Sequence, residues 1–371
     1  MNLAILTVHQ APNCGAMLQA WALKTVLERE GHNVEFPDCN HINYRGRELP
    51  FITPPDLRGA RRLSRGVKNW LRNLSGREIF RRAMDGFDQF RLKNMRERVI
   101  SPEEFLGKYD AVILGSDQIW NGRIMGEDLS IFLGERIPDE VKKLSYAASF
   151  GDCQPQGEEL TRMINAVNRF TAIGVREESA MELLAGKTRI EPKLTIDPTL
   201  LLEAEDYRKV STPSHPAEPY LYAYSLIYVE EFYQKVKAVA KQLGLKVIYT
   251  PLSQYTSYQM PKGITYGVSP DQFVDLIANA NCVVTDSFHG TAVTLLHGKS
   301  LVSISHAKNR QHSRHGLVLS KLGCEERLCG LDVSVEKMAE LLTTPMSDEV
   351  AKRLKALRED SSSWLKKAVE E

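Results

Sequence analysis

The sequence has no long apolar run. None of its 371 residues lies in a stretch near the roughly 20 apolar residues that a membrane-spanning helix needs. The residues after Met1 also lack the pattern of a secretory signal. We therefore expect a protein of the cytoplasm, either free in solution or at the inner face of the cell membrane.

Cysteines are few and are not grouped for a metal. The six are Cys14, Cys39, Cys153, Cys282, Cys324 and Cys329. Cys324 and Cys329 lie five positions apart with no second pair, which argues against a zinc site. We expect reduced thiols, and neither a metal nor a cofactor.

Net charge is also small, at +1, so the chain as a whole gives no reason to expect a nucleic-acid partner. One block departs from this balance: between Arg58 and Arg98 there are 13 Lys and Arg against 4 Asp and Glu. Its apolar residues have helical spacing; they are Leu63, Val67, Trp70, Leu71 and Leu74. Such a helix can contact anionic lipid, or it can pack on its own domain with its charges in water.

Strand and helix patterns alternate along the chain, which predicts α/β structure with parallel sheets. The expected strands are 2–8, 34–36, 109–115, 144–150, 172–176, 220–225, 246–250, 282–285 and, as the last, 300–304. The length favours two domains with a cleft between them. We place the first at about 1–200, with a basic helical insertion at about 41–108. The second covers 201–345, and a C-terminal helix within 346–371 can pack back on the first.

One stretch combines a buried strand with a polar corner and a helix start. Cys282 to Thr285 forms the strand, and Asp286, Ser287 and His289 follow it. The free N–H groups and dipole of a helix N-terminus favour an anion, and a histidine there can supply a proton. The alternative is that Asp286 and Ser287 only cap the helix.

Polar residues follow other strands as well. Ser116 and Asp117 come after the strand at 109–115, and Arg176 ends the strand at 172–176, where a guanidinium can meet a phosphate or carboxylate. The alternative for Arg176 is an ion pair with Glu177 or Asp197. The first turn lacks the G-x-G-x-x-G spacing, so dinucleotide binding is not supported.

These motifs, taken in order, resemble the polysaccharide pyruvyl transferase family from about residue 3 to residue 325. The matching segments are Asn13-Cys14-Gly15, Gly115 to Trp120, Ala148 to Gly151, Val175 to Glu177, Asp197 to Thr199 and Asp286 to Thr291. The resemblance implies a GT-B-like fold of two facing α/β domains. It also implies transfer of pyruvyl from phosphoenolpyruvate, a co-substrate, to a sugar hydroxyl pair as a ketal, in the biosynthesis of bacterial surface or capsular polysaccharide.

The resemblance places the donor site at His289-Gly290 in the second domain and the acceptor side on the first. Family members have Arg two positions before this His, where this chain has Ser287. We expect Arg314, or Arg310 with Lys308, to supply that cation. The acceptor expected from the family is a sugar on a lipid-linked oligosaccharide, which a basic 58–98 segment at a membrane would suit.

The roles expected for single residues follow. His289 is the candidate acid, and Asp117 or Asp286 the candidate for accepting a hydroxyl proton. The candidate binding residues are Asn13, Gly15, Ser116, Gln118, Ser149, Arg176, Ser287, Gly290, Thr291, Arg310 and Arg314. Two other classes stay open: a GT-B glycosyltransferase that uses a nucleotide sugar, and a non-catalytic sugar-binding or scaffold protein.

Overall fold

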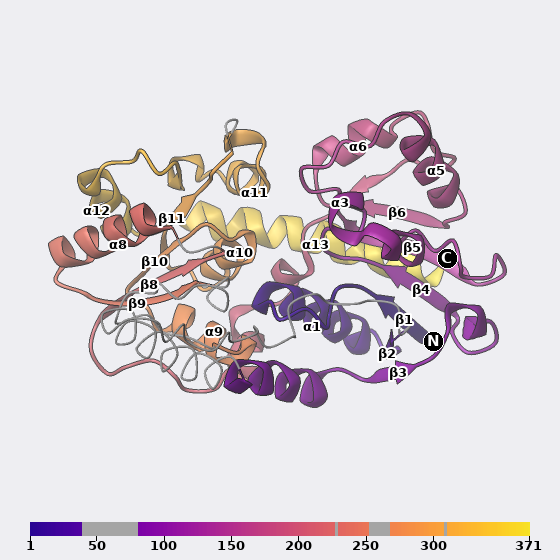
Figure 1. Cartoon of the computed structure of the whole chain (residues 1–371), viewed down its shortest axis with the longest axis horizontal. Helices are drawn as coiled ribbons and strands as arrows, with labels where there is room; N and C mark the ends of the chain where they lie inside the picture. The colour runs from indigo at the N-terminus through magenta and orange to yellow at the C-terminus, as the bar shows by residue number, and fades with distance from the viewer. Residues whose placement is uncertain (39–80, 227–228, 252–267, 308–309) are drawn as a thin grey trace, which may run out of the picture.

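The computed structural model describes residues 1–38, 81–226, 229–251, 268–307 and 310–371. Its first sheet has seven parallel strands in the order β3-β2-β1-β4-β5-β6-β7. Their bounds are β1 Asn2–Leu6, β2 Asn33–Asp38, β3 Glu97–Val99, β4 Ala111–Leu114, β5 Lys142–Ala148, β6 Ala172–Val175 and β7 Lys193–Leu194. The central strands β1 and β4 are apolar and buried because helices cover both faces of this sheet (Figure 1).

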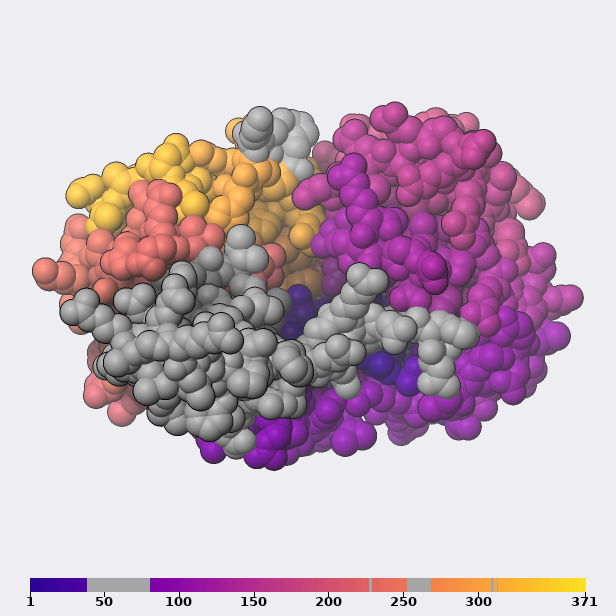
Figure 2. Space-filling model, viewed as in Figure 1, coloured from indigo at the N-terminus to yellow at the C-terminus, as the bar shows by residue number. Residues whose placement is uncertain are grey.

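The second sheet has five parallel strands in the order β12-β11-β10-β8-β9. Their bounds are β8 Tyr220–Ser225, β9 Lys246–Pro251, β10 Cys282–Thr285, β11 Ser300–Ile304 and β12 Leu328–Cys329. Two parallel-sheet α/β domains therefore face each other, which confirms the predicted fold class. Figure 2 shows them as two lobes that meet at a furrow.

Helices connect the strands within each domain. Those of the first are α1 Cys14–Arg29, α3 Gly122–Met125, α4 Leu129–Phe132, α5 Gly157–Val167, α6 Glu178–Leu184 and α7 Ala204–Val210, with a further helix across 81–94. Those that follow are α8 Glu230–Leu243, α9 Pro270–Ala278, α10 Phe288–Leu296, α11 Arg314–Leu322, α12 Val335–Thr343 and α13 Asp348–Glu370.

The helix ends follow the local sequence. Ser269 and Gln272 form a capping box at the start of α9, where Pro270 takes the first turn. At the other end of α8, Gly244 adopts a left-handed conformation that closes the last turn with little steric cost. These signals show that the residues at a helix end fix where the helix begins or stops.

Three short strands were not predicted from the sequence. One of them, β12, is the last strand along the chain, so the prediction that 300–304 is the last strand was wrong. β3 lies inside the segment interpreted as an interruption of the α/β pattern, and β7 has only two residues. Edge strands of two or three residues carry too little alternation to be recognised.

Each sheet has a switch point, where the connection to the next strand reverses direction. In the first sheet it lies between β1 and β4, and in the second between β8 and β10. Thr7 Oγ1 donates to Ser116 O at 2.9 Å across the first, and Leu226 N donates to Asp286 Oδ1 at 2.7 Å across the second. Ligands of open α/β sheets bind at such positions, beyond the carboxyl ends of the strands.

The C-terminal helix α13 joins the two domains. It contacts α11 of the second and then runs along the first sheet beside β5 (Figure 1). Ser361 Oγ accepts a hydrogen bond from Ile196 N at 3.1 Å, and Lys142 Nζ donates to Val369 O at 2.9 Å. This packing fixes the backbone next to Asp197.

Most of the basic helix expected at 63–74 cannot be assessed, because it lies outside the described residues. Within the described part of the block the arginines pair with the first domain. Arg91 contacts Asp88 at 3.1 Å and also pairs with Glu97, and Arg98 donates to Glu35 at 2.8 Å. Arg91 and Arg98 are thus engaged in local ion pairs, and Arg96 donates to Asn33 Oδ1 at 2.7 Å.

Candidate active site

Three acidic residues of the first domain surround the guanidinium of Arg176. Its Nη1 lies 2.8 Å from Asp197 Oδ2, its Nη2 3.5 Å from Asp117 Oδ1 and its Nε 3.8 Å from Glu177 Oε2. Only the first distance is a hydrogen bond, so neither Nε nor Nη2 hydrogen-bonds to a described residue. The ion pair weighed as an alternative for Arg176 exists, but it leaves N–H groups for a ligand.

The second domain contributes His289. Its Nε2 lies 3.6 Å from Asp197 Oδ2, and the imidazole packs on the backbone of Gly15 at the start of α1. A Cβ at Gly15 would lie 2.1 Å from His289 Nδ1, so only glycine fits there without displacement. His289 therefore reaches from one domain to the switch point of the other.

Asp197 is held by several donors at once. Thr199 donates through both its backbone N–H, at 2.9 Å, and its hydroxyl, at 2.7 Å, and Ser116 Oγ donates at 3.3 Å. Burial by itself would raise the pKa of Asp197, but the positive charges of His289 and Arg176 outweigh it and hold that pKa well below 3.8. The carboxylate is thus a fixed negative charge at the domain boundary.

A second arginine approaches from the other domain. The guanidinium carbons of Arg176 and Arg314 lie 5.0 and 6.0 Å from the ring centroid of Phe288. The guanidinium of Arg314 has no hydrogen bond or ion pair with a described residue. Burial, and then the like charge of Arg176, lower the pKa of Arg314. Two cations held close together favour binding of an anion.

Charge balance at the site is set by burial and by these neighbours. Burial would lower the pKa of Arg176, but Asp197, Asp117 and Glu177 together raise it. Burial raises the pKa of Glu177 against the pull of Arg176. Arg176 therefore stays charged, while the carboxyl of Glu177 takes up a proton more readily than an exposed one.

A small cavity lies between Arg176, Asp197, Phe288 and Arg314, with a volume of about 30 Å³. That volume is about the volume of one water molecule in the liquid. A molecule with both a phosphate and a carboxylate is larger than this cavity.

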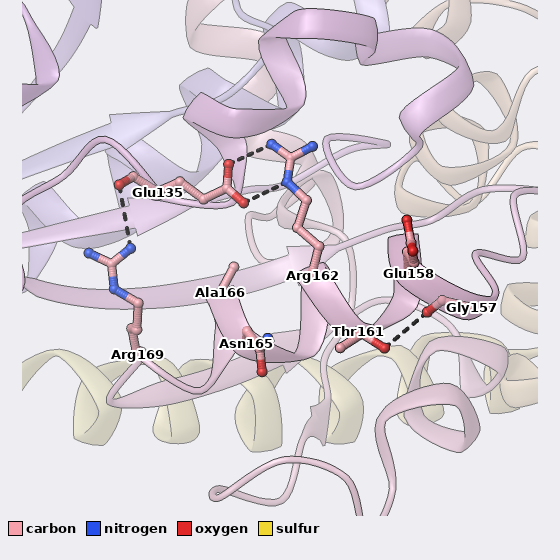
Figure 3. Close-up of a pocket in the computed structure, with 8 residues that line it drawn as sticks. All are labelled: Glu135, Gly157, Glu158, Thr161, Arg162, Asn165, Ala166 and Arg169. Atoms are coloured by element: carbon pink, nitrogen blue, oxygen red, sulfur yellow. Dashed lines mark hydrogen bonds and ion pairs between the residues drawn. The ribbon is translucent and has the colours of Figure 1, made fainter.

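A larger hollow lies on the outer face of α5 (Figure 3), with a volume of about 720 Å³. Figure 3 shows the guanidinium of Arg162 turned toward Glu135, and their Nε–Oε1 distance is 2.7 Å. Arg169 donates to the backbone O of Glu135 at 3.4 Å. None of the predicted site residues lines this hollow, and its cations already have partners.

Several predicted binding residues have internal structural roles. Asn13 caps α1, accepting from Gly15 N at 2.9 Å. Ser287 caps α10, accepting from Gly290 N at 3.2 Å through its hydroxyl and from Thr291 N at 2.9 Å through its carbonyl. The N–H groups of Gly290 and Thr291 are thus engaged within the helix, although we had expected them to face an anion.

Other predicted residues support the site carboxylates. Ser149 accepts from Gly151 N at 2.9 Å and also hydrogen-bonds to Glu177, which raises the acidity of that carboxyl. Gln118 accepts from Asn121 Nδ2 at 3.1 Å. The backbone N–H of Gln118 also donates to Asp117 Oδ1 at 2.8 Å.

Asp286 and Arg310 are directed elsewhere. Asp286 does not cap α10; it accepts from Leu226 N and pairs with His306 Nε2 at 3.1 Å. Arg310 pairs with Asp332 at 2.6 Å. Of the predicted site residues, the structure therefore brings together Gly15, Ser116, Asp117, Arg176, His289 and Arg314, while Lys308 lies outside the described residues.

Sequence reasoning missed Asp197 as a site residue, since it was named only within a family-matching segment and as an ion-pair partner for Arg176. It also gave no role to Phe288 or His306. The signal for Asp197 was its place after β7, but a two-residue strand hides the pattern of a polar residue at a strand's end. No three or more His, Cys, Asp or Glu side chains of the described residues are grouped to hold a metal ion.

The family is decided by the sequence match. The model of the family described as polysaccharide pyruvyl transferase matches residues 13–309, well over half of the chain. This chain belongs to the polysaccharide pyruvyl transferase family. The match spans Gly15, Arg176, Asp197 and His289, whereas Arg314 lies five positions beyond its end. Searching the curated proteins gave no match.

Solved structures with a related arrangement include the spinosyn rhamnosyltransferase SpnG with thymidine diphosphate, at 10% identity, TM-score 0.46 and full coverage of both chains. The UDP-GlcNAc 2-epimerase of Methanocaldococcus jannaschii has 12% identity and TM-score 0.46, over 97% of this chain and 99% of that one. The ADP-heptose heptosyltransferase II of E. coli has 12% identity and TM-score 0.37, over 97% and 99%. Likenesses at this level carry no argument about the substrate.

No helix within the described ranges is both long and apolar enough to cross a membrane. The contact with anionic lipid expected for residues 58–98 is a separate matter, and most of that segment lies outside the described residues.

Proposed function

We propose that this pyruvyl transferase takes pyruvyl from phosphoenolpyruvate and joins it to two hydroxyls of a sugar as a cyclic ketal. The sugar belongs to a lipid-linked precursor of bacterial surface or capsular polysaccharide. The observation that carries the proposal is the meeting of Arg176, His289 and Arg314 at the boundary of the two domains.

These groups suit the donor's two anions. Arg176 has two N–H groups without a described hydrogen-bond partner, and Arg314 has no described ion-pair partner. Guanidinium groups bind phosphate and carboxylate through paired, charge-assisted hydrogen bonds. One arginine from each domain can therefore bind one anionic group of the donor, so that the donor bridges the two domains.

The chemistry begins with a proton. His289 donates it to the methylene carbon, which leaves an oxocarbenium-like centre that a sugar hydroxyl attacks. Phosphate then leaves and the second hydroxyl closes the ring. Asp197 Oδ2 faces His289 Nε2 at 3.6 Å and holds the imidazole in position.

The experiment that tests the donor is isothermal titration of phosphoenolpyruvate into the wild-type protein, His289→Ala and Arg314→Ala, with and without saccharide mixtures. Saturable binding that both substitutions weaken is the expected result. No binding under any of these conditions, together with saturable binding of a nucleotide sugar, would contradict the proposal and favour glycosyl transfer.

The basic residues of 58–98 are proposed to hold the enzyme at anionic lipid, near a lipid-linked acceptor. Binding to vesicles of anionic phospholipid should fall with rising salt and vanish when residues 58–75 are deleted. Vesicles of neutral lipid are the control. Unchanged binding after the deletion would show that this segment is not the lipid contact.

A further inference from the structure

A histidine–carboxylate pair lies at the carboxyl end of the second sheet. Asp286 directly follows β10, and His306 lies two residues beyond β11, which pairs with β10. His306 Nε2 is 3.1 Å from Asp286 Oδ2. Two neighbouring strands thus bring the pair together at the edge where ligands of α/β sheets bind.

The two members of the pair differ in exposure. The Asp286 side chain is 2% exposed and the His306 side chain 39%. Both Asp286 oxygens are engaged, one by His306 and the other by Leu226 N at 2.7 Å. Asp286 is therefore closed to a substrate, whereas His306 presents an Nδ1 to which no described residue hydrogen-bonds.

His306 also belongs to the same neighbourhood as His289. After burial, the positive charges of Arg314, His306 and His289 each help to lower the pKa of His315 to about 3. His315 is buried and its Nδ1 lies 3.1 Å from Ser303 Oγ of β11. The three groups therefore lie around one buried side chain.

Ketal formation needs a base as well as an acid. Two hydroxyl protons are lost, while one proton is gained by the methylene carbon and one leaves with phosphate. His289 can supply the proton for carbon, but the first attacking hydroxyl must lose its own proton as its oxygen bonds to the central carbon.

We propose that His306 is a further catalytic residue, the base that takes this hydroxyl proton on Nδ1, and that Asp286 positions it. This inference rests on the proposed function. As the hydroxyl O–H bond breaks and the new C–O bond forms, Asp286 compensates the charge of the imidazolium. The arrangement of a buried carboxylate that orients an exposed imidazole is a recurring one for proton transfer.

The electrostatic setting suits a base near neutral pH. The hydrogen bond that His306 donates to Asp286 raises the pKa of His306 above its usual 6.5, against a smaller effect of burial. The other charged or titratable groups near this pair include His289, Arg314 and His315 of α10 and α11, and Tyr249 of β9, which interacts with Asp286.

The test compares His306→Gln with His215→Gln. His215 forms a similar pair in the same domain, with its Nδ1 2.8 Å from Asp275 Oδ2 and its side chain 37% exposed. It precedes β8, however, and therefore lies at the amino end of the strands, away from the candidate site. Turnover is followed as phosphate released from phosphoenolpyruvate with a saccharide acceptor. We expect kcat to fall about 100-fold or more in His306→Gln, and to stay near wild type in His215→Gln.

Two more readouts separate a catalytic role from a structural one. Binding of phosphoenolpyruvate to His306→Gln should stay within about twofold of wild type, and imidazole should restore part of the turnover of His306→Ala. In Asp286→Asn the rising limb of the pH–rate profile should move to lower pH, because the group that raises the pKa of His306 is gone.

The outcomes distinguish failure of this inference from failure of the proposed function. Wild-type protein that binds no phosphoenolpyruvate and releases no phosphate would contradict both the inference and the proposed function. If the wild type is active and the His306→Gln variant keeps at least a third of its kcat and an unchanged pH profile, the inference alone is overturned. Loss of donor binding in His306→Gln would also overturn it, since His306 would then hold the donor.

Discussion

His289 Nε2 of the second domain lies 3.6 Å from Asp197 Oδ2 of the first. The candidate site is therefore complete only when the two domains meet, because neither contains both groups. The cavity beside this contact, of about 30 Å³, is too small for the proposed donor. We therefore expect binding of the donor to be accompanied by a rearrangement of the groups around this contact.

Replacing Asp197 by Ala should be strongly destabilising. The change leaves the buried charge of Arg176 without its nearest partner, and removing one member of a buried pair costs about 3–5 kcal/mol. Denaturant unfolding measures this as the free energy of unfolding. The matched control is Asp360→Ala, which breaks an exposed pair with Lys193 and should cost less than about 1 kcal/mol. Equal losses in the two variants would contradict the importance of burial.

Gly15→Ala should impair activity through His289. A Cβ at this position would overlap Nδ1 of the imidazole, so the ring or the start of α1 must shift. A displacement of about 1 Å at a catalytic group can cost about 100-fold in turnover. Turnover of the variant, with phosphoenolpyruvate and acceptor, provides the measurement.

The double variant supplies the control for this steric argument. In a His289→Ala background the Gly15→Ala change should cost less stability than in the wild type, because the overlapping ring is absent. The coupling between the two positions should be about 0.5–3 kcal/mol. Fully additive losses would show that the contact is not the cause.

His315 should make the protein less stable in acid. Its pKa is lowered to about 3 in the folded protein, chiefly by burial, while in the unfolded chain it is near 6.5. Between these values the unfolded state binds one more proton, so stability is present above pH 6.5 and is lost as the pH falls. The loss from this one group is about 1.4 kcal/mol per pH unit.

The variant His315→Asn should lose stability less steeply than wild type between pH 6 and pH 4.5. Denaturant unfolding at several pH values measures both slopes. Their difference cancels the effects of His297 and His32, whose pKa values burial also lowers. Parallel slopes would exclude His315 as the group responsible.

Arg314, rather than Arg310, should take the place of the family arginine that Ser287 replaces. Arg314 lies beside Phe288 with no ion-pair partner among the described residues, whereas Arg310 is paired with Asp332. Loss of a charge-assisted hydrogen bond costs about 1.5–3 kcal/mol, so Arg314→Ala should weaken donor binding by about 10- to 150-fold. Arg310→Ala should change it by less than about threefold. The reverse order in a titration would assign the cation to Arg310.

Much of the fold could be predicted from sequence because its signals are local. Buried strands such as β4 and β10 are short apolar runs, and the polar residues directly after them mark the ligand-binding edge of each sheet. The two-residue strands β7 and β12 were missed because they are held by neighbouring strands rather than by a pattern of their own.

Asp117, Arg176 and His289 were predictable as single candidates because each follows a strand. What the sequence could not decide is which of them meet. Asp197 faces His289, and Asp286 faces His306 instead of capping α10, because the packing of one element on another sets these distances.

The amino-acid sequence by itself thus determined the α/β pattern, the family and most of the polar residues at the strand ends, since these depend on neighbours along the chain. Only the tertiary structure decided that a histidine of one domain rests on Gly15 and Asp197 of the other. It also decided that the guanidinium groups of Arg176 and Arg314 both lie over the ring of Phe288. Those contacts join residues far apart in sequence. Because they are buried at the domain boundary, the electrostatic interactions between their charges are stronger than they would be in water.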